Sequence, residues 1–163
     1  AKPNKAHLKL AEMEQAGKLS AIVTQNIDGL HQAAGSKNVF ELHGSVHRNY
    51  CQKCGKFFDV NYVVNAKGVP YCDECGGIIK PDVVLYEEGL DSQTINGAVR
   101  AISKADMLII GGTSLVVYPA AGMIDYFKGK YLAVLNRDAT SRDKQADLCI
   151  TDLIGEVLGR IRV

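Results

Sequence analysis

The sequence predicts an α/β fold, in which a parallel sheet carries helices on both faces and a small metal-binding module is inserted. Apolar runs of strand length alternate with amphipathic segments of helical length, which is the pattern of β-α-β units. Four of the five cysteines form two Cys-x-x-Cys pairs. A length of 163 residues suits one domain with a small insertion.

The first elements follow from capping residues and apolar spacing. Asn4 can cap a helix that stops at Gly17, with apolar Ala6, Leu10 and Met13 on one face. The apolar residues from Leu19 to Thr24 predict a buried strand. A polar loop then extends to Ser45 and is followed by the cysteine pairs.

The second half of the chain repeats the alternation. We expect helices beginning at Asp91 or Ser92, at Pro119 and after Asp152, which can cap the last helix, and strands at 107–110, 131–135 and 148–150. Three predicted strands end in polar or glycine-bearing loops, at 25–26, 112–114 and 136–137. Parallel strands place such ends at one edge of a sheet, where one crevice can gather them and nucleotides commonly bind.

Composition and charge exclude several classes of protein. Hydrophobic residues make up 47% and charged residues 23%, as in ordinary globular proteins. Lys plus Arg is 19 and Asp plus Glu is 18, which argues against binding to nucleic acid or to an anionic membrane. No apolar run approaches the roughly 20 residues that span a bilayer.

The cysteine pattern predicts a structural zinc ion. Cys51, Cys54, Cys72 and Cys75 have the spacing of a four-cysteine zinc ribbon, with 17 residues between the pairs. Four thiolates saturate zinc and leave no position for a reacting water. Packing or redox chemistry is the alternative role for these cysteines. Because metal-binding cysteines suit a reducing compartment, we expect a cytoplasmic protein.

A histidine beside a glycine marks a candidate catalytic position. His43 precedes Gly44, and a histidine can accept a proton from a hydroxyl. Considered by residue type, a loop histidine of this kind is more often structural. The segments Thr24-Gln25-Asn26-Ile27-Asp28 and Glu41-Leu42-His43-Gly44 together strongly resemble the sirtuins, the nicotinamide-cofactor-dependent protein lysine deacylases.

The resemblance implies a role for each matching residue. It implies that His43 is the general base of an NAD-dependent protein lysine deacylase, most simply a deacetylase, which releases nicotinamide and O-acyl-ADP-ribose. The implied NAD-binding residues are Gln25, Asn26, Ile27, Asp28, Gly112, Thr113, Ser114, Asn136, Arg137 and Ile150. The implied partner is an acyl-lysine peptide or protein held at Val84, Tyr86 and Val117. Glu87 stands where many family members have glycine.

The resemblance also implies a domain organisation. We expect a Rossmann-like NAD-binding domain from 1–43 and 81–163, and a zinc-binding module from 44–80. Sirtuins open with a strand, a Gly-Ala-Gly loop and a Pro-Asp-Phe-Arg motif, and none of these occurs in residues 1–163. We therefore expect residues 1–163 to be part of a longer molecule. Two other functions stay open: mono-ADP-ribosyl transfer at the same site, and a zinc-ribbon binding module without catalysis.

Overall fold

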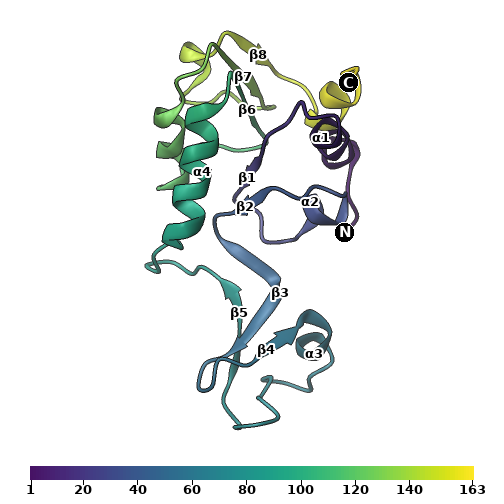
Figure 1. The fold of residues 1–163 in the computed structure, drawn as a ribbon, viewed down its shortest axis with the longest axis vertical. Helices are drawn as coiled ribbons and strands as arrows, with labels where there is room; N and C mark the ends of the chain where they lie inside the picture. Colours follow the sequence, from purple (N-terminus) through teal and green to yellow (C-terminus); the bar gives the residue numbers. More distant parts are fainter. The chain divides into compact units, whose positions relative to one another are not determined.

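The computed structural model describes residues 1–163, which divide into two compact units. Unit 1 comprises 1–23, 30–40 and 91–163, and unit 2 comprises 24–29 and 41–90. Figure 1 shows their helices and strands in chain order. None of the helices combines the length and apolar character that crossing a bilayer requires.

Unit 1 contains a parallel sheet of β6 (Met107–Gly111), β7 (Tyr131–Leu135) and β8 (Leu148–Ile150), in that order. The predicted strands at these positions and their parallel pairing are therefore confirmed. The remaining elements that lie wholly or mostly in unit 1 are α1 (Lys5–Gln15), β1 (Ile22–Thr24), α2 (Leu30–Ala33), β2 (Val39–Glu41), α4 (Ser92–Lys104), the 3₁₀ helices η1 (Ala120–Tyr126) and η2 (Asp143–Gln145), and α5 (Ile154–Gly159). The strand predicted at 19–24 shortens to β1 and pairs with β2 instead of joining β6–β8.

Helical segments cover both faces of the parallel sheet. Alternate residues of each strand point to opposite sides, so one strand contacts the helices of both layers. On one side, Leu132 and Val134 of β7 pack with Ile124 of η1. On the other side, Leu135 packs with Ala6 of α1 and Leu158 of α5. Figure 1 shows α1 beside α5, and these two helices are in contact. The expected helices on both faces are thus present.

Capping explains where the two longest helices begin. The Asn4 side chain accepts hydrogen bonds from the backbone N–H groups of Ala6 and His7, and Asp91 accepts one from Thr94 at the start of α4. The Asn4 cap was predicted, and the start of α4 lies where the sequence predicts it, at Asp91 or Ser92. The predicted cap of the last helix is wrong, because Leu153 occupies the N-cap of α5 and Asp152 accepts a bond only from the N–H of Leu153.

The segment after Pro119 is a 3₁₀ helix, where the sequence predicts a longer α-helix. The backbone N–H of Gly122 donates to the carbonyl of Pro119, which is the tighter pairing of a 3₁₀ turn. Glycine also weakens an α-helix by about 1 kcal/mol relative to alanine. Of the apolar face expected here, Ala120 and Met123 are buried, and Ile124 and Phe127 are partly buried in the same core.

Unit 2 is built on an antiparallel sheet in the order β4-β3-β5. Its elements are β3 (Gly44–Cys51), β4 (Phe57–Asp59), the short helix α3 (Val60–Val64) and β5 (Ile79–Val83). Asn49 of β3 is 1% exposed, and its side-chain amide donates to the carbonyls of Val46 and Phe58. The residues predicted as a zinc module, 44–80, fall within this unit.

Candidate functional site

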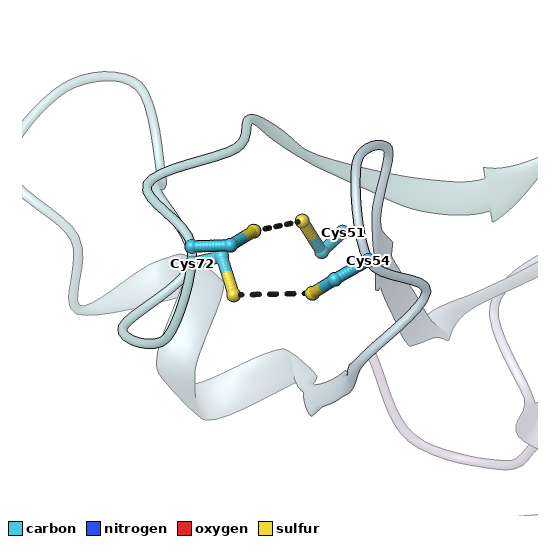
Figure 2. A group of neighbouring side chains, drawn as sticks. Cys51, Cys54 and Cys72 are labelled. Carbon is cyan, nitrogen blue, oxygen red and sulfur yellow. Dashed lines mark hydrogen bonds between the residues drawn. The ribbon is translucent and has the colours of Figure 1, made fainter.

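The four paired cysteines converge in unit 2. All four sulfur atoms lie within 4.8 Å of one another, with 3.4 Å between Cys51 and Cys75 and 3.7 Å between Cys54 and Cys72. Figure 2 shows the sulfur atoms of Cys51, Cys54 and Cys72 pointing into the space between two loops. Tetrahedral zinc with Zn–S bonds of about 2.3 Å requires neighbouring sulfurs about 3.8 Å apart. The cluster therefore fits one zinc ion.

The close packing of these cysteines shifts their pKa values in opposite directions. The backbone N–H of Cys54 hydrogen-bonds the Cys51 sulfur and lowers the pKa of this thiol to about 6. The N–H of Lys56 acts in the same direction on Cys54, but the side chain of Cys75, desolvation and the side chain of Cys51 outweigh it and raise the pKa of Cys54 to about 12. Several thiolates at this spacing repel one another, and a divalent cation removes that repulsion.

The predicted catalytic histidine is held from its Nδ1 atom. His43 lies between β2 and β3, and its Nδ1 is 3.0 Å from the carbonyl oxygen of Gln25. A carbonyl oxygen only accepts hydrogen bonds, so Nδ1 carries the proton. In the neutral ring, Nε2 is then left with a lone pair. The structure thus brings together the predicted base and the first residue of the predicted cofactor motif.

The backbone around His43 is tied to the segment predicted to bind peptide. The N–H of Val84 donates to the carbonyl of His43 over 3.1 Å, and Gly44 pairs with Val83. Gly44 has φ of +76°, and a Cβ at this position would collide with the carbonyl oxygen of Asp82. Only glycine satisfies both conditions. The backbone therefore requires a glycine after His43, independently of the chemistry proposed for the His-Gly pair.

The rest of the predicted peptide segment is exposed in unit 2. Tyr86 is fully exposed, and Val84 is half-buried. Glu87 has φ of +72°, in the left-handed region that glycine favours. Glu87 therefore adopts the backbone conformation expected of the glycine that it replaces, at a cost of order 1 kcal/mol.

The predicted cofactor motif at 25–28 also lies in unit 2. Asn26 and Asp28 are exposed, while Gln25 and Ile27 are half-buried. The N–H of Asn26 donates to the hydroxyl of Thr24 over 3.1 Å, which forms a tight turn directly after β1.

The other predicted cofactor loops meet at the carboxyl ends of the parallel strands in unit 1. The N–H of Gly112 donates to the carbonyl of Leu135, and the N–H of Asn136 donates to the carbonyl of Ile150. The structure therefore places these two loops at one edge of the sheet. The third loop expected there, 25–26, follows β1, which pairs with β2 in a separate sheet. Ser114, Arg137 and Val117 are exposed, and Thr113 is half-buried with its hydroxyl accepting from the N–H of Leu115.

Two residues near His43 carry contacts that the sequence did not predict. The Nε2 atom of His47 is 2.9 Å from the carbonyl oxygen of Asp28. Arg48 binds both Glu41 and Asp82, at 2.7 and 2.8 Å. Burial alone would lower the pKa of Arg48, but its hydrogen bonds to Glu41 and Asp82 outweigh burial and raise this pKa. No motif marks either residue, and only their place in β3 reveals them.

The fold and the cysteine cluster define an α/β protein with a parallel sheet and a structural zinc module. The sequence profile of the Sir2 family matches residues 1–119. The chain belongs to the Sir2 family, and the resemblance to sirtuins is confirmed.

Two clostridial proteins illustrate this relationship. A Clostridium acetobutylicum protein named NAD-dependent protein deacetylase is 67% identical over 159 residues, which cover 97% of this chain and 65% of that protein. A Clostridium perfringens protein of the same name is 66% identical over 161 residues, which cover 98% of this chain and 66% of that protein. The chain thus spans slightly less than two thirds of these relatives.

Solved structures confirm the fold class. A structure described as Sir2 with a p53 peptide and NAD⁺ superposes with a TM-score of 0.91 at 41% identity, covering 98% of this chain and 69% of that one. A Sir2 structure with the inhibitor EX-527, 2′-O-acetyl-ADP-ribose and deacetylated p53 peptide gives a TM-score of 0.91 at 42% identity, covering 98% and 70%.

Proposed function

We propose that the protein containing this chain is an NAD-dependent protein lysine deacylase, most simply a deacetylase. The observation that carries the proposal is the family's His-Gly pair, His43-Gly44, with Nδ1 of His43 donating to the carbonyl of Gln25. The clostridial relatives named NAD-dependent protein deacetylase support the same activity.

The hydrogen-bonding groups of the predicted residues suit NAD. The exposed amide of Asn26 and carboxylate of Asp28 match a nicotinamide carboxamide and ribose hydroxyls, together with Gln25 and Ile27 of the same motif. For the remaining part of NAD we propose the loops at the carboxyl ends of the parallel strands: Gly112, Thr113, Ser114, Asn136, Arg137 and Ile150. Gly112 has φ of +62° and open space where a Cβ would stand, which suits backbone approach to a ligand.

His43 acts as the general base in this proposal. Bound NAD would supply the acceptor for the acyl oxygen, at its nicotinamide-bearing ribose carbon, with nicotinamide as the leaving group. The carbonyl of Gln25 holds the proton of His43 on Nδ1, so that Nε2 is available to accept a proton from a ribose hydroxyl. The same hydrogen bond fixes the plane of the ring.

We further propose that Val84, Tyr86 and Val117 bind the acyl-lysine peptide. Val84 follows β5 directly and lies beside His43 through its backbone hydrogen bond, and strand addition is a common way of binding a peptide. Solved Sir2 structures with acetylated peptide support a peptide substrate.

Zinc has a structural role in the 44–80 module, which in this proposal is inserted in an NAD-binding domain of 1–43 and 81–163. Metal-binding thiols without a disulfide support a cytoplasmic location.

The test uses the full-length protein, an acetyl-lysine peptide and NAD, with nicotinamide and O-acetyl-ADP-ribose as the measured products. His43→Ala is expected to lower kcat by about 10²- to 10⁴-fold, which is the usual contribution of a general base. His7→Ala is the matched control, because it removes a histidine whose ring accepts from the N–H of Asn4 at the start of α1, and it is expected to leave kcat unchanged. Turnover that survives His43→Ala, or that proceeds without NAD, contradicts the proposal. ADP-ribose on a protein acceptor without deacylated peptide favours mono-ADP-ribosyl transfer instead.

A further inference from the structure

A bulge interrupts the pairing of β3 with β5. Ser45 pairs with Asp82, but the next pair is Asn49 with Pro81, so residues 46–48 have no partner on β5. Such bulges bend a strand and redirect its side chains, and they are frequent beside active sites. The sequence Val46-His47-Arg48 is therefore free of the β3–β5 ladder and makes other contacts.

The first half of the bulge holds the loop of the cofactor motif. The N–H of Val46 donates to the carbonyl of Ile27 over 3.1 Å. The carbonyl of Asp28 accepts a hydrogen bond from Nε2 of His47 over 2.9 Å. The His47 ring also fills the space beside Gly29, where a Cβ would lie 2.7 Å from the ring. Two consecutive carbonyls of the loop are thus bound by two consecutive residues of the bulge.

The last residue of the bulge, Arg48, contacts a residue that precedes His43 and a residue in the strand that pairs with Gly44. The Arg48 guanidinium donates through Nη1 to Glu41, two residues before His43, and through Nε to Asp82, near the end of β5 and two residues before Val84, whose N–H binds the His43 carbonyl. The Glu41 side chain is 8% exposed, so this carboxylate depends on Arg48 for a charged partner. The fork of the guanidinium fixes the distance between the two carboxylates.

We propose that residues 46–48 of β3 position the two substrates separately, with His47 fixing the cofactor loop and Arg48 fixing the peptide strand beside His43. The inference rests on the proposed deacylase function for its kinetic consequences. Neither residue is catalytic. Each acts through a backbone segment that carries predicted site residues. His47 contacts Asp28, which precedes the bulge in sequence, and Arg48 contacts Asp82, which follows it.

Kinetics of the full-length protein test this separation. His47→Ala is expected to raise KM for NAD about fivefold, which corresponds to one lost hydrogen bond, and to leave KM for peptide within twofold. His47→Gln places an amide N–H near the position of Nε2 and is expected to restore KM for NAD. Arg48→Gln is expected to raise KM for peptide about fivefold or more and to leave KM for NAD within twofold. Arg48→Lys gives an intermediate value, because an ammonium lacks the fork.

Hydrogen exchange provides a readout that does not depend on activity. His47→Ala is expected to speed exchange in residues 24–29 and to leave the amide of Val84 protected. Arg48→Gln is expected to expose the Val84 amide and to leave 24–29 unchanged. Variants that change both segments equally, or neither, overturn the inference. If the parent protein does not deacylate, the proposed function fails, and the exchange pattern still decides the positioning roles.

Discussion

The apolar clusters of the two units differ in what holds them together. In unit 2, the buried cluster consists of Cys51, Phe58, Cys72 and Ile79, so half of it is made of the proposed metal ligands. In unit 1, the two clusters contain aliphatic residues from strands and helices, such as Val134, Leu135 and Leu158. We therefore expect the four-cysteine module to depend on a bound ion for its stability, whereas the parallel sheet is stabilised by ordinary aliphatic side chains.

Removing one zinc ligand is expected to have the largest effect. Structural zinc contributes apparent binding free energies of about 10–16 kcal/mol in zinc-finger peptides, and that energy is folding energy. Cys51→Ala in the full-length protein is therefore expected to lose the ion and the amide protection of β3, β4 and β5. Protection of β6 and β7 is expected to remain. Metal analysis and hydrogen exchange measure the two outcomes.

The chain offers a matched control for this substitution. Cys149 in β8 is exposed and stands apart from the four-cysteine cluster. Cys149→Ala is expected to retain one zinc per chain and the parent exchange pattern. If Cys51→Ala also kept its zinc and its protection in β3, the module would have a core of its own, and the contrast between the units would be wrong.

A cavity in the aliphatic core is expected to have the next largest effect. Leu158 is 1% exposed and packs in the cluster with Ala6 and Leu135. Leu158→Ala is expected to lower the free energy of unfolding by about 2–5 kcal/mol, through lost burial and the cavity left behind. Zinc content is expected to stay at one ion per chain, because the metal does not stabilise this cluster.

Denaturant unfolding of the full-length protein measures the effect of Leu158→Ala. Leu153, at the N-cap of α5, is 54% exposed and provides the control. Leu153→Ala is expected to change the free energy of unfolding by less than about 0.5 kcal/mol. Equal losses from both substitutions would mean that burial in this cluster does not stabilise unit 1.

Sequence predicted the regular parts of unit 1 better than unit 2, for physical reasons. The caps of α1 and α4 and the apolar strands at 107–111 and 131–135 are local signals, and the structure contains all of them. Strand β3 carries no clear alternation, because its fully buried Asn49 looks like a surface residue. Strand β5 contains Pro81, and a proline in a sequence indicates a break in a strand.

The candidate site divides in the same way. The cysteine spacing predicted a cluster that the structure contains, because each Cys-x-x-Cys turn is local. His43 was found through its neighbours in sequence, but its hydrogen bond to Gln25 joins residues 18 apart and has no sequence signal. The roles of His47 and Arg48 arise from the bulge in β3, and a change of register cannot be seen in a single sequence.

Substitution of one carboxylate in unit 1, Glu14, is expected to have the smallest effect on the free energy of unfolding. The effect is expected to depend on pH, which distinguishes it from the loss of an apolar contact. Both oxygens of Glu14 accept backbone N–H bonds, from Asn38 at 2.7 Å and from Lys37 at 2.9 Å, which join α1 to the segment before β2. The bond from Asn38 is the main reason that the pKa of Glu14 lies below its ordinary value of 4.5. A carboxyl with a lowered pKa in the folded state adds stability above the unfolded value and loses it as pH falls through the folded value.

Glu14→Gln is therefore expected to lower the free energy of unfolding by about 1 kcal/mol near neutral pH. The difference from the parent should shrink as the pH falls below about 4.5, where the unfolded carboxyl becomes protonated. Glu12→Gln on the same helix is the control, since Glu12 is 54% exposed and pairs only with Lys9. Denaturant unfolding across this pH range measures both variants. A difference that stays constant with pH would mean that the amide bonds of 37–38, and not the charge of Glu14, hold this segment to α1.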